Sequence, residues 1–176
     1  MQVNRVVVGV SGSAGSLVAL RYAADLAQDH NCELMPVLAW TPPGGEMADR
    51  RHPCAELRAS WRAHAQERLR EAIDRGIGGP PPALPFDPQP IRGDTGTVLT
   101  TIAARNGDVL IVGTGRHGVL RRPVCCHVAR YCLAHAVCPV IAVPPTALAD
   151  SAHGLRSWMG RHRANPEDEL LHVTAL

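Results

Sequence analysis

Apolar residues along this chain alternate between continuous runs and helical spacing. Continuous runs at 5–10, 34–40, 108–113 and 139–143 have the length and β-branched content of buried strands. Between the runs, apolar residues recur every three or four positions. This spacing predicts helices over 17–31, along 57–73 with an end at Gly76, over 94–103 and over 124–136. Strands that alternate with helices predict an α/β fold, with a doubly wound parallel sheet and helices on both of its faces.

A further strand, third in chain order, is needed to complete the alternation. It has to lie in or just after the proline-rich stretch 76–90, and we expect it near Leu84 to Arg92. Because proline has no N–H to donate to a neighbouring strand, this strand is predicted to lie at an edge of the sheet.

Turns of small residues follow two of the predicted strands. Ser11-Gly12 follows the first strand, and Gly113-Thr114-Gly115 follows the fourth. Ligands of doubly wound sheets bind at the carboxyl ends of the strands, where free backbone N–H groups can hold a phosphate. The two turns together predict an anion-binding site at this end of the sheet.

Composition narrows the classes of function. The 18 basic residues, all arginine, against 16 acidic ones leave a net charge of +2, and aromatic residues make up 3%. This balance disfavours a dedicated nucleic-acid binder, and the lack of lysine excludes a catalytic or P-loop lysine. No apolar run approaches the roughly 18–20 residues that span a bilayer, and the first residues do not resemble a signal peptide. We therefore expect a cytoplasmic protein with reduced thiols, without nucleic-acid or membrane partners.

Four segments resemble the universal stress protein family in their order and spacing over residues 3–145. They are Val6–Ser13, Gly93–Asp94, Asp108–Gly113 and Cys138–Pro144. The resemblance implies a five-stranded sheet in the order 3-2-1-4-5, a non-enzymatic role in the stress response, and a homodimer through strand 139–143. We expect one domain over 1–145, followed by a polar C-terminal tail over 146–176.

The resemblance also implies how ATP-binding members hold the nucleotide, with an acidic residue after strand one and a G-x2-G-x9-G-S/T motif after strand four. Here Ser11 takes the acidic position, and Gly113 keeps the first glycine. Arg116 stands at the second glycine and Cys126-His127 at the final pair, which puts bulk where backbone would curl around phosphates. We predict impaired or absent ATP binding, and therefore either no cofactor or ATP or another adenine nucleotide that binds weakly. The candidate contacts are Gly9, Val10, Ser11, Ala39, Val112, Gly113, Arg116, Cys126, His127 and Val128.

Two alternative hypotheses remain at this stage. In the first, arginine side chains on the 113–123 loop rebuild an anion site and give a nucleotide-binding switch, since guanidinium groups suit phosphate geometry. The basic residues concerned are Arg116, His117, Arg121 and Arg122. In the second, Cys126 beside His127 is an activated thiol at a helix N-terminus and senses redox state.

A metal site is disfavoured by spacing. Zinc-ligand residue types do cluster late in the chain, at Cys125, Cys126, His127, Cys132 and His135. Adjacent residues point about 100° apart on a helix, and the chain has no CxxC pair. We therefore predict no metal.

Overall fold

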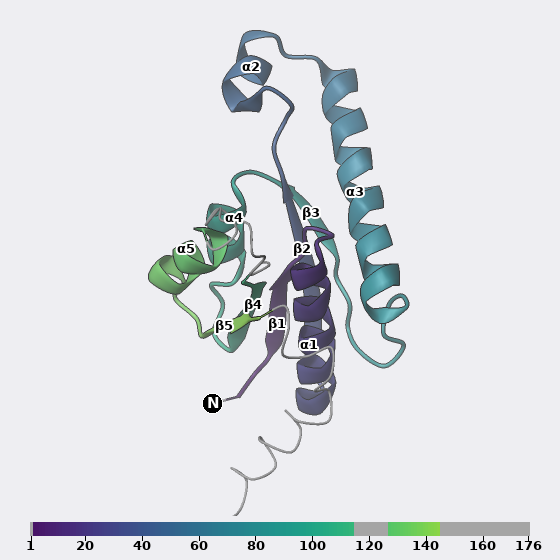
Figure 1. Cartoon of the computed structure of the whole chain (residues 1–176), viewed down its shortest axis with the longest axis vertical. Helices are drawn as coiled ribbons and strands as arrows, with labels where there is room; N and C mark the ends of the chain where they lie inside the picture. Colours follow the sequence, from purple (N-terminus) through teal and green to yellow (C-terminus); the bar gives the residue numbers. More distant parts are fainter. Residues whose placement is uncertain (1, 115–126, 145–176) are drawn as a thin grey trace, which may run out of the picture. The chain divides into compact units, whose positions relative to one another are not determined.

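The computed structural model describes residues 2–114 and 127–144 and forms a five-stranded parallel sheet (Figure 1). The strands lie in the order β3-β2-β1-β4-β5, which confirms the predicted fold. In chain order the elements are β1 (Arg5–Gly9), α1 (Ala14–His30), β2 (Glu33–Trp40), α2 (Gly45–Arg51), α3 (Ala55–Ile77), β3 (Gln89–Arg92), α4 (Thr95–Ile102), β4 (Asp108–Gly113), α5 (His127–His135) and β5 (Val140–Val143).

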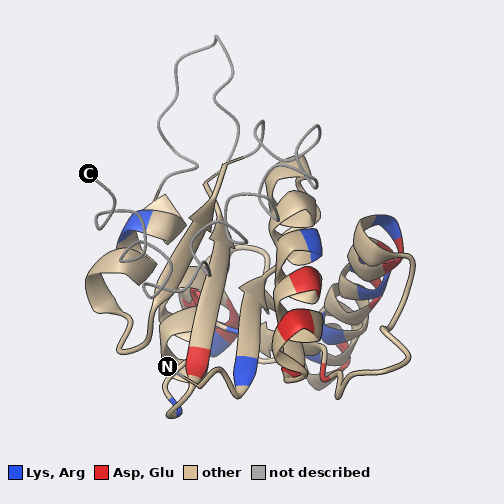
Figure 2. Cartoon of the chain, turned by 90° about the horizontal axis from the view of Figure 1, so that it is seen from below, with Lys and Arg blue, Asp and Glu red and all other residues tan. Residues whose placement is uncertain are grey.

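Helices cover both faces of the sheet, with α1 and α3 on one side and α4 and α5 on the other (Figure 1). The sheet residues Val7, Val37 and Leu110 are buried against Leu99 of α4 and Cys132 of α5. Side chains alternate between the faces along each strand, so the residues between these face α1 and α3. The charged residues of the strands lie only at strand ends, and charge is most frequent on α2 and α3 (Figure 2). None of the helices in the described ranges is both long and apolar enough to span a bilayer.

Strand β3 lies at a sheet edge, as its prolines predicted, but it is shorter than expected. Only Gln89–Arg92 form the strand, and Phe86 makes a single isolated bridge with Leu34. The N–H of Gly93 donates to the carbonyl of Trp40 at 2.9 Å. By alternation, the N–H of Ile91 also points to β2, and Pro90 occupies an outward position. Proline at an outward position removes a donor from the exposed edge and guards it against pairing.

The region after β2 differs most from the sequence prediction. An additional helix, α2, precedes α3, and α3 ends at Ile77 with Gly78 as a left-handed cap at φ 76°. The predicted end at Gly76 is wrong. A Cβ on Gly76 would lie 2.8 Å from Cδ2 of Leu20, so this glycine allows α1 and α3 to pack closely. Leu57, expected on the buried face of the helix, is 50% exposed.

Helix α4 matches its prediction. Asp94 caps its N-terminus by accepting a hydrogen bond from the N–H of Thr97 at 3.2 Å. Helix α5 and strand β5 lie within the predicted segments 124–136 and 139–143. Residues 124–126 of the expected helix lie outside the described part of the chain.

A buried ion pair joins the amino ends of the two central strands. The Nη2 and Nε atoms of Arg5 contact the two carboxylate oxygens of Asp108 at 2.7 and 3.0 Å. Arg5 also donates to the carbonyl of Ile102, and Asp108 accepts from the N–H of Arg105. At most 4% of either residue is exposed. The pairing and the added hydrogen bonds compensate for burying two charges.

Candidate functional site

A cluster of three serine side chains closes the turn between β1 and α1; we call Ser11, Ser13 and Ser16 the serine cluster. The hydroxyl of Ser11 lies 3.0 Å from the hydroxyl of Ser13 and 3.2 Å from that of Ser16. Ser13 caps α1 by accepting from the N–H of Ser16, whose hydroxyl donates to the carbonyl of Ser13 at 2.9 Å. Gly12 turns the chain with φ +80°, a conformation that side chains disfavour. The three hydroxyls therefore have partners within the turn.

Arg68 of α3 reaches the same turn. Its Nη2 donates to the carbonyl of Ser11 at 3.3 Å from an exposed position. The guanidinium group brings positive charge to the place where the family resemblance implies an acidic residue. Sequence reasoning missed Arg68. No local pattern indicates which turn an exposed arginine of α3 contacts.

Gly113, at the end of β4, packs directly against the first turn of α1. A Cβ on Gly113 would lie 2.7 Å from the carbonyl oxygen of Gly15 and 3.2 Å from the nitrogen of Ser16. The ends of β1 and β4 therefore meet at the start of α1, as the parallel sheet predicted. Beyond Gly113, the N–H of Thr114 donates to the carbonyl of Val143 at the end of β5.

Several other candidate residues take part in core packing or in hydrogen bonds of the sheet. A Cβ on Gly9 would lie 2.8 Å from Leu99, so the backbone of Gly9 accommodates that core side chain. The N–H of Val10 donates to the carbonyl of Val37 at 2.8 Å. The side chains of three further candidates pack in or against the core beneath α4 and α5: Ala39, Val112 and Val128.

His127 is exposed at the first position of α5. The remaining candidates lie outside the described residues: Arg116, His117, Arg121, Arg122, Cys125 and Cys126. The described residues therefore test neither the arginine-loop hypothesis nor the Cys126 thiol hypothesis. Within 2–114 and 127–144, no three His, Cys, Asp or Glu side chains are grouped to hold a metal.

The described cysteines are free thiols at buried or half-buried positions. Burial raises the pKa of Cys132 to about 11 and also raises the pKa values of Cys32 and Cys138. A thiolate is the reactive form of cysteine, so a raised pKa lowers reactivity. These three cysteines suit packing better than thiol chemistry.

Comparisons with known proteins agree with the fold. The model of the universal stress protein family matches residues 2–144. A universal stress protein solved in complex with cAMP is 24% identical with a TM-score of 0.60, and the match covers 83% of this chain and all of that one. The universal stress protein UspA from Lactobacillus plantarum is 19% identical with a TM-score of 0.62, covering 81% and 99%.

A universal stress protein from Arabidopsis thaliana with AMP bound is 17% identical with a TM-score of 0.51, covering 82% of this chain and 93% of that one. No curated protein matches the sequence at a significant level. At these identities the solved structures support the fold, and the family assignment comes from the family model.

Proposed function

The chain belongs to the universal stress protein family, and from this premise we propose that it is a non-enzymatic, stress-associated binding protein with an impaired nucleotide site. Two structural neighbours were solved with cAMP and AMP. An adenine nucleotide is therefore the ligand class that we propose for any binding that this chain retains, and we expect ATP to bind weakly or not at all.

The observation that carries this proposal is the state of the turn after β1. An acidic side chain there would accept hydrogen bonds from ribose or adenine donors. Ser11 offers a neutral hydroxyl instead, and that hydroxyl already contacts Ser13 and Ser16. Arg68 adds a positive charge at the carbonyl of Ser11, where no carboxylate balances it within the turn. The polar groups of the turn therefore stabilise the turn itself and are poorly suited to bind a nucleoside.

The retained glycine after β4 is compatible with lost binding. Gly113 fits the close approach of α1, whose first-turn backbone leaves no space for a Cβ. This packing requires glycine whether or not a phosphate binds nearby. The presence of Gly113 therefore does not indicate that this chain binds a nucleotide.

Calorimetry with ATP tests the proposal on three proteins. We expect the wild-type chain to bind with a dissociation constant weaker than about 1 mM, which corresponds to about −4 kcal/mol. Ser11→Asp alone should not produce tight binding, because Arg116 and Cys126-His127 still replace the motif glycines. The triple variant Ser11→Asp, Arg116→Gly, Cys126→Gly should bind measurably better than either. Micromolar binding by the wild-type protein would refute the proposal.

The same proposal includes a homodimer formed through β5. The strand Val140–Val143 is an apolar sheet edge without charge or proline, and three of its four residues are only partly buried. Such an edge favours pairing with a second copy. Analytical ultracentrifugation at tens of micromolar should give a dimer, and a monomer at that concentration would contradict this part of the proposal. We also propose the cytoplasm as the compartment, which agrees with free thiols at Cys32, Cys54, Cys132 and Cys138.

A further inference from the structure

Helix α2 buries none of its apolar side chains in the described part of the chain. Its one buried residue is Asp49, and its largest apolar side chain, Met47, is 63% exposed. A helix of seven residues is too short to be stable by itself in water. Interactions of its polar side chains must therefore hold it in place.

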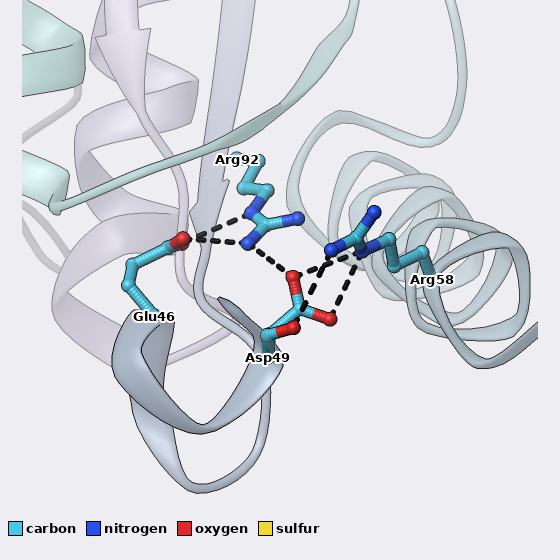
Figure 3. Close-up of polar contacts among 4 residues, drawn as sticks. All are labelled: Glu46, Asp49, Arg58 and Arg92. Carbon is cyan, nitrogen blue, oxygen red and sulfur yellow. Dashed lines mark hydrogen bonds and ion pairs between the residues drawn. The ribbon is translucent and has the colours of Figure 1, made fainter. Parts of the chain in front are cut away.

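Those interactions are ion pairs with residues of α3 and β3 (Figure 3). Asp49 accepts from Nε of Arg58 at 2.9 Å and from Nη2 of Arg92 at 2.6 Å. Glu46 contacts the same Nη2 atom of Arg92 at 2.5 Å. The Asp49 side chain is 1% exposed, but those of Arg58 and Glu46 are each 40% exposed. Because solvent reaches most of the network, dissolved salt can weaken it.

The chain on both sides of α2 is suited to rotation. Gly44 caps the helix and Gly45 is its first residue, and both have φ +82°, a conformation that glycine adopts easily and other residues rarely adopt. His52 ends the helix, and Pro53 prevents its direct continuation into α3. The helix thus lies between two breaks in regular structure.

The network also connects α2 to the carboxyl end of β2. The guanidinium carbon of Arg92 lies 6.0 Å from the centre of the Trp40 ring. The Nε1 atom of Trp40 is buried and has no hydrogen-bond partner among the residues that the structure describes. Loss of the contacts with Glu46 and Asp49 would free Arg92 to move away from the ring of Trp40.

We propose that α2 is a flap held closed by charge, which opens at Gly44–Gly45 and at His52–Pro53 while the rest of the domain stays folded. Opening uncovers Trp40 and releases the guanidinium groups of Arg58 and Arg92 at the carboxyl end of the sheet. This inference does not depend on nucleotide binding and stands or falls separately from the proposed function.

Limited trypsin digestion tests the flap, because Arg50 and Arg51 are exposed residues within α2. Cleavage follows the open population when closing is faster than cutting. Mass spectrometry should show that Asp49→Asn raises the cleavage rate after Arg50 or Arg51 about tenfold or more, equivalent to ~1.4 kcal/mol. Glu46→Gln should raise it less. Added NaCl should raise it in the wild-type protein, after correction for the activity of trypsin on a short peptide.

The matched control is Glu67→Gln, which removes an exposed ion pair with Arg70 on α3 and leaves the α2 network intact. It should not change cleavage in α2. A second readout is the fluorescence of Trp40 in a Trp61→Phe, Trp158→Phe background, where Asp49→Asn should shift emission to longer wavelength. The proposal is overturned if neither salt nor Glu46→Gln changes cleavage in α2. It is equally overturned if cleavage there rises only together with cleavage after Arg75, because cutting inside the packed half of α3 reports unfolding of the domain.

Discussion

The two ends of the β1–β4 pair are built on different physical principles. At the amino end, Arg5 and Asp108 are buried, joined by two short contacts and bonded to backbone groups. At the carboxyl end, the serine cluster and Gly113 form a turn of small neutral groups, beside the exposed side chain of Arg68. The first end fixes how two strands lie together, and the second leaves backbone and hydroxyl groups near solvent. The same two strands are therefore held by a buried ion pair at one end and by the packing of small neutral groups at the other.

The amino end should show the largest effect of a single substitution. Asp108→Ala leaves the guanidinium group of Arg5 buried without its partner, which costs about 3–5 kcal/mol in other buried pairs. Urea denaturation should show this loss in the free energy of unfolding. The double variant Arg5→Met, Asp108→Leu removes both charges and should recover part of it. If Asp108→Ala lowers the free energy of unfolding by less than about 1 kcal/mol, the ion pair is not the main interaction that stabilises this end of the strands.

At the carboxyl end, the strongest effect should come from packing. Gly113→Ala forces a methyl group against the backbone of Gly15 and should cost about 1–3 kcal/mol. Gly12→Asn is the matched control, because no described residue lies within 4 Å of the Cβ position of Gly12 and asparagine tolerates positive φ. Thermal unfolding should rank Gly113→Ala well below the control in stability. Equal melting temperatures would show that α1 moves away without cost.

Within the serine cluster, the capping residue should matter more than the residue at the candidate site. Ser13→Ala removes the side-chain cap of α1 and should cost about 1 kcal/mol. Ser11→Ala removes a hydroxyl that contacts the other two hydroxyls of the cluster and accepts a long, 3.4 Å hydrogen bond from the N–H of Ser13. It should cost less, because this exposed hydroxyl does not cap a helix. Chemical denaturation of both variants decides the order. The reverse order would indicate that Ser11 is the organising residue of the turn.

The smallest effect on stability is expected for Arg68. Its 3.3 Å hydrogen bond is made from an exposed side chain, and surface substitutions of this kind change stability by about 0.5 kcal/mol or less. Arg68→Ala should therefore unfold at nearly the wild-type denaturant concentration. A clear loss of stability would show that the carboxyl end depends on charge as the amino end does, and the contrast between the ends would fail.

Local patterns in the sequence determined most of the fold. The apolar runs of β1 and β4, the Asp94 cap of α4 and the proline content of β3 each depend on residues within a few positions of one another. Period, capping and the missing N–H of proline act over that range, so they can be read without a structure. The position of Ser11 and Gly113 at one edge also followed, because parallel strands bring their carboxyl ends together.

Tertiary contacts decided the rest. Arg5 and Asp108 are 103 positions apart, Arg68 and Ser11 are 57 apart, and Arg92 and Glu46 are 46 apart. The spacing of charged residues along the sequence does not indicate which distant residue each one contacts. None of these contacts could therefore be predicted from spacing. Helix α2 was missed for the same reason, because it buries no apolar face and is held by side chains of α3 and β3. Gly76 shows that a local pattern can also mislead. A glycine after a helical run predicts the end of the helix, but Gly76 lies inside α3, where the missing Cβ leaves space for Leu20.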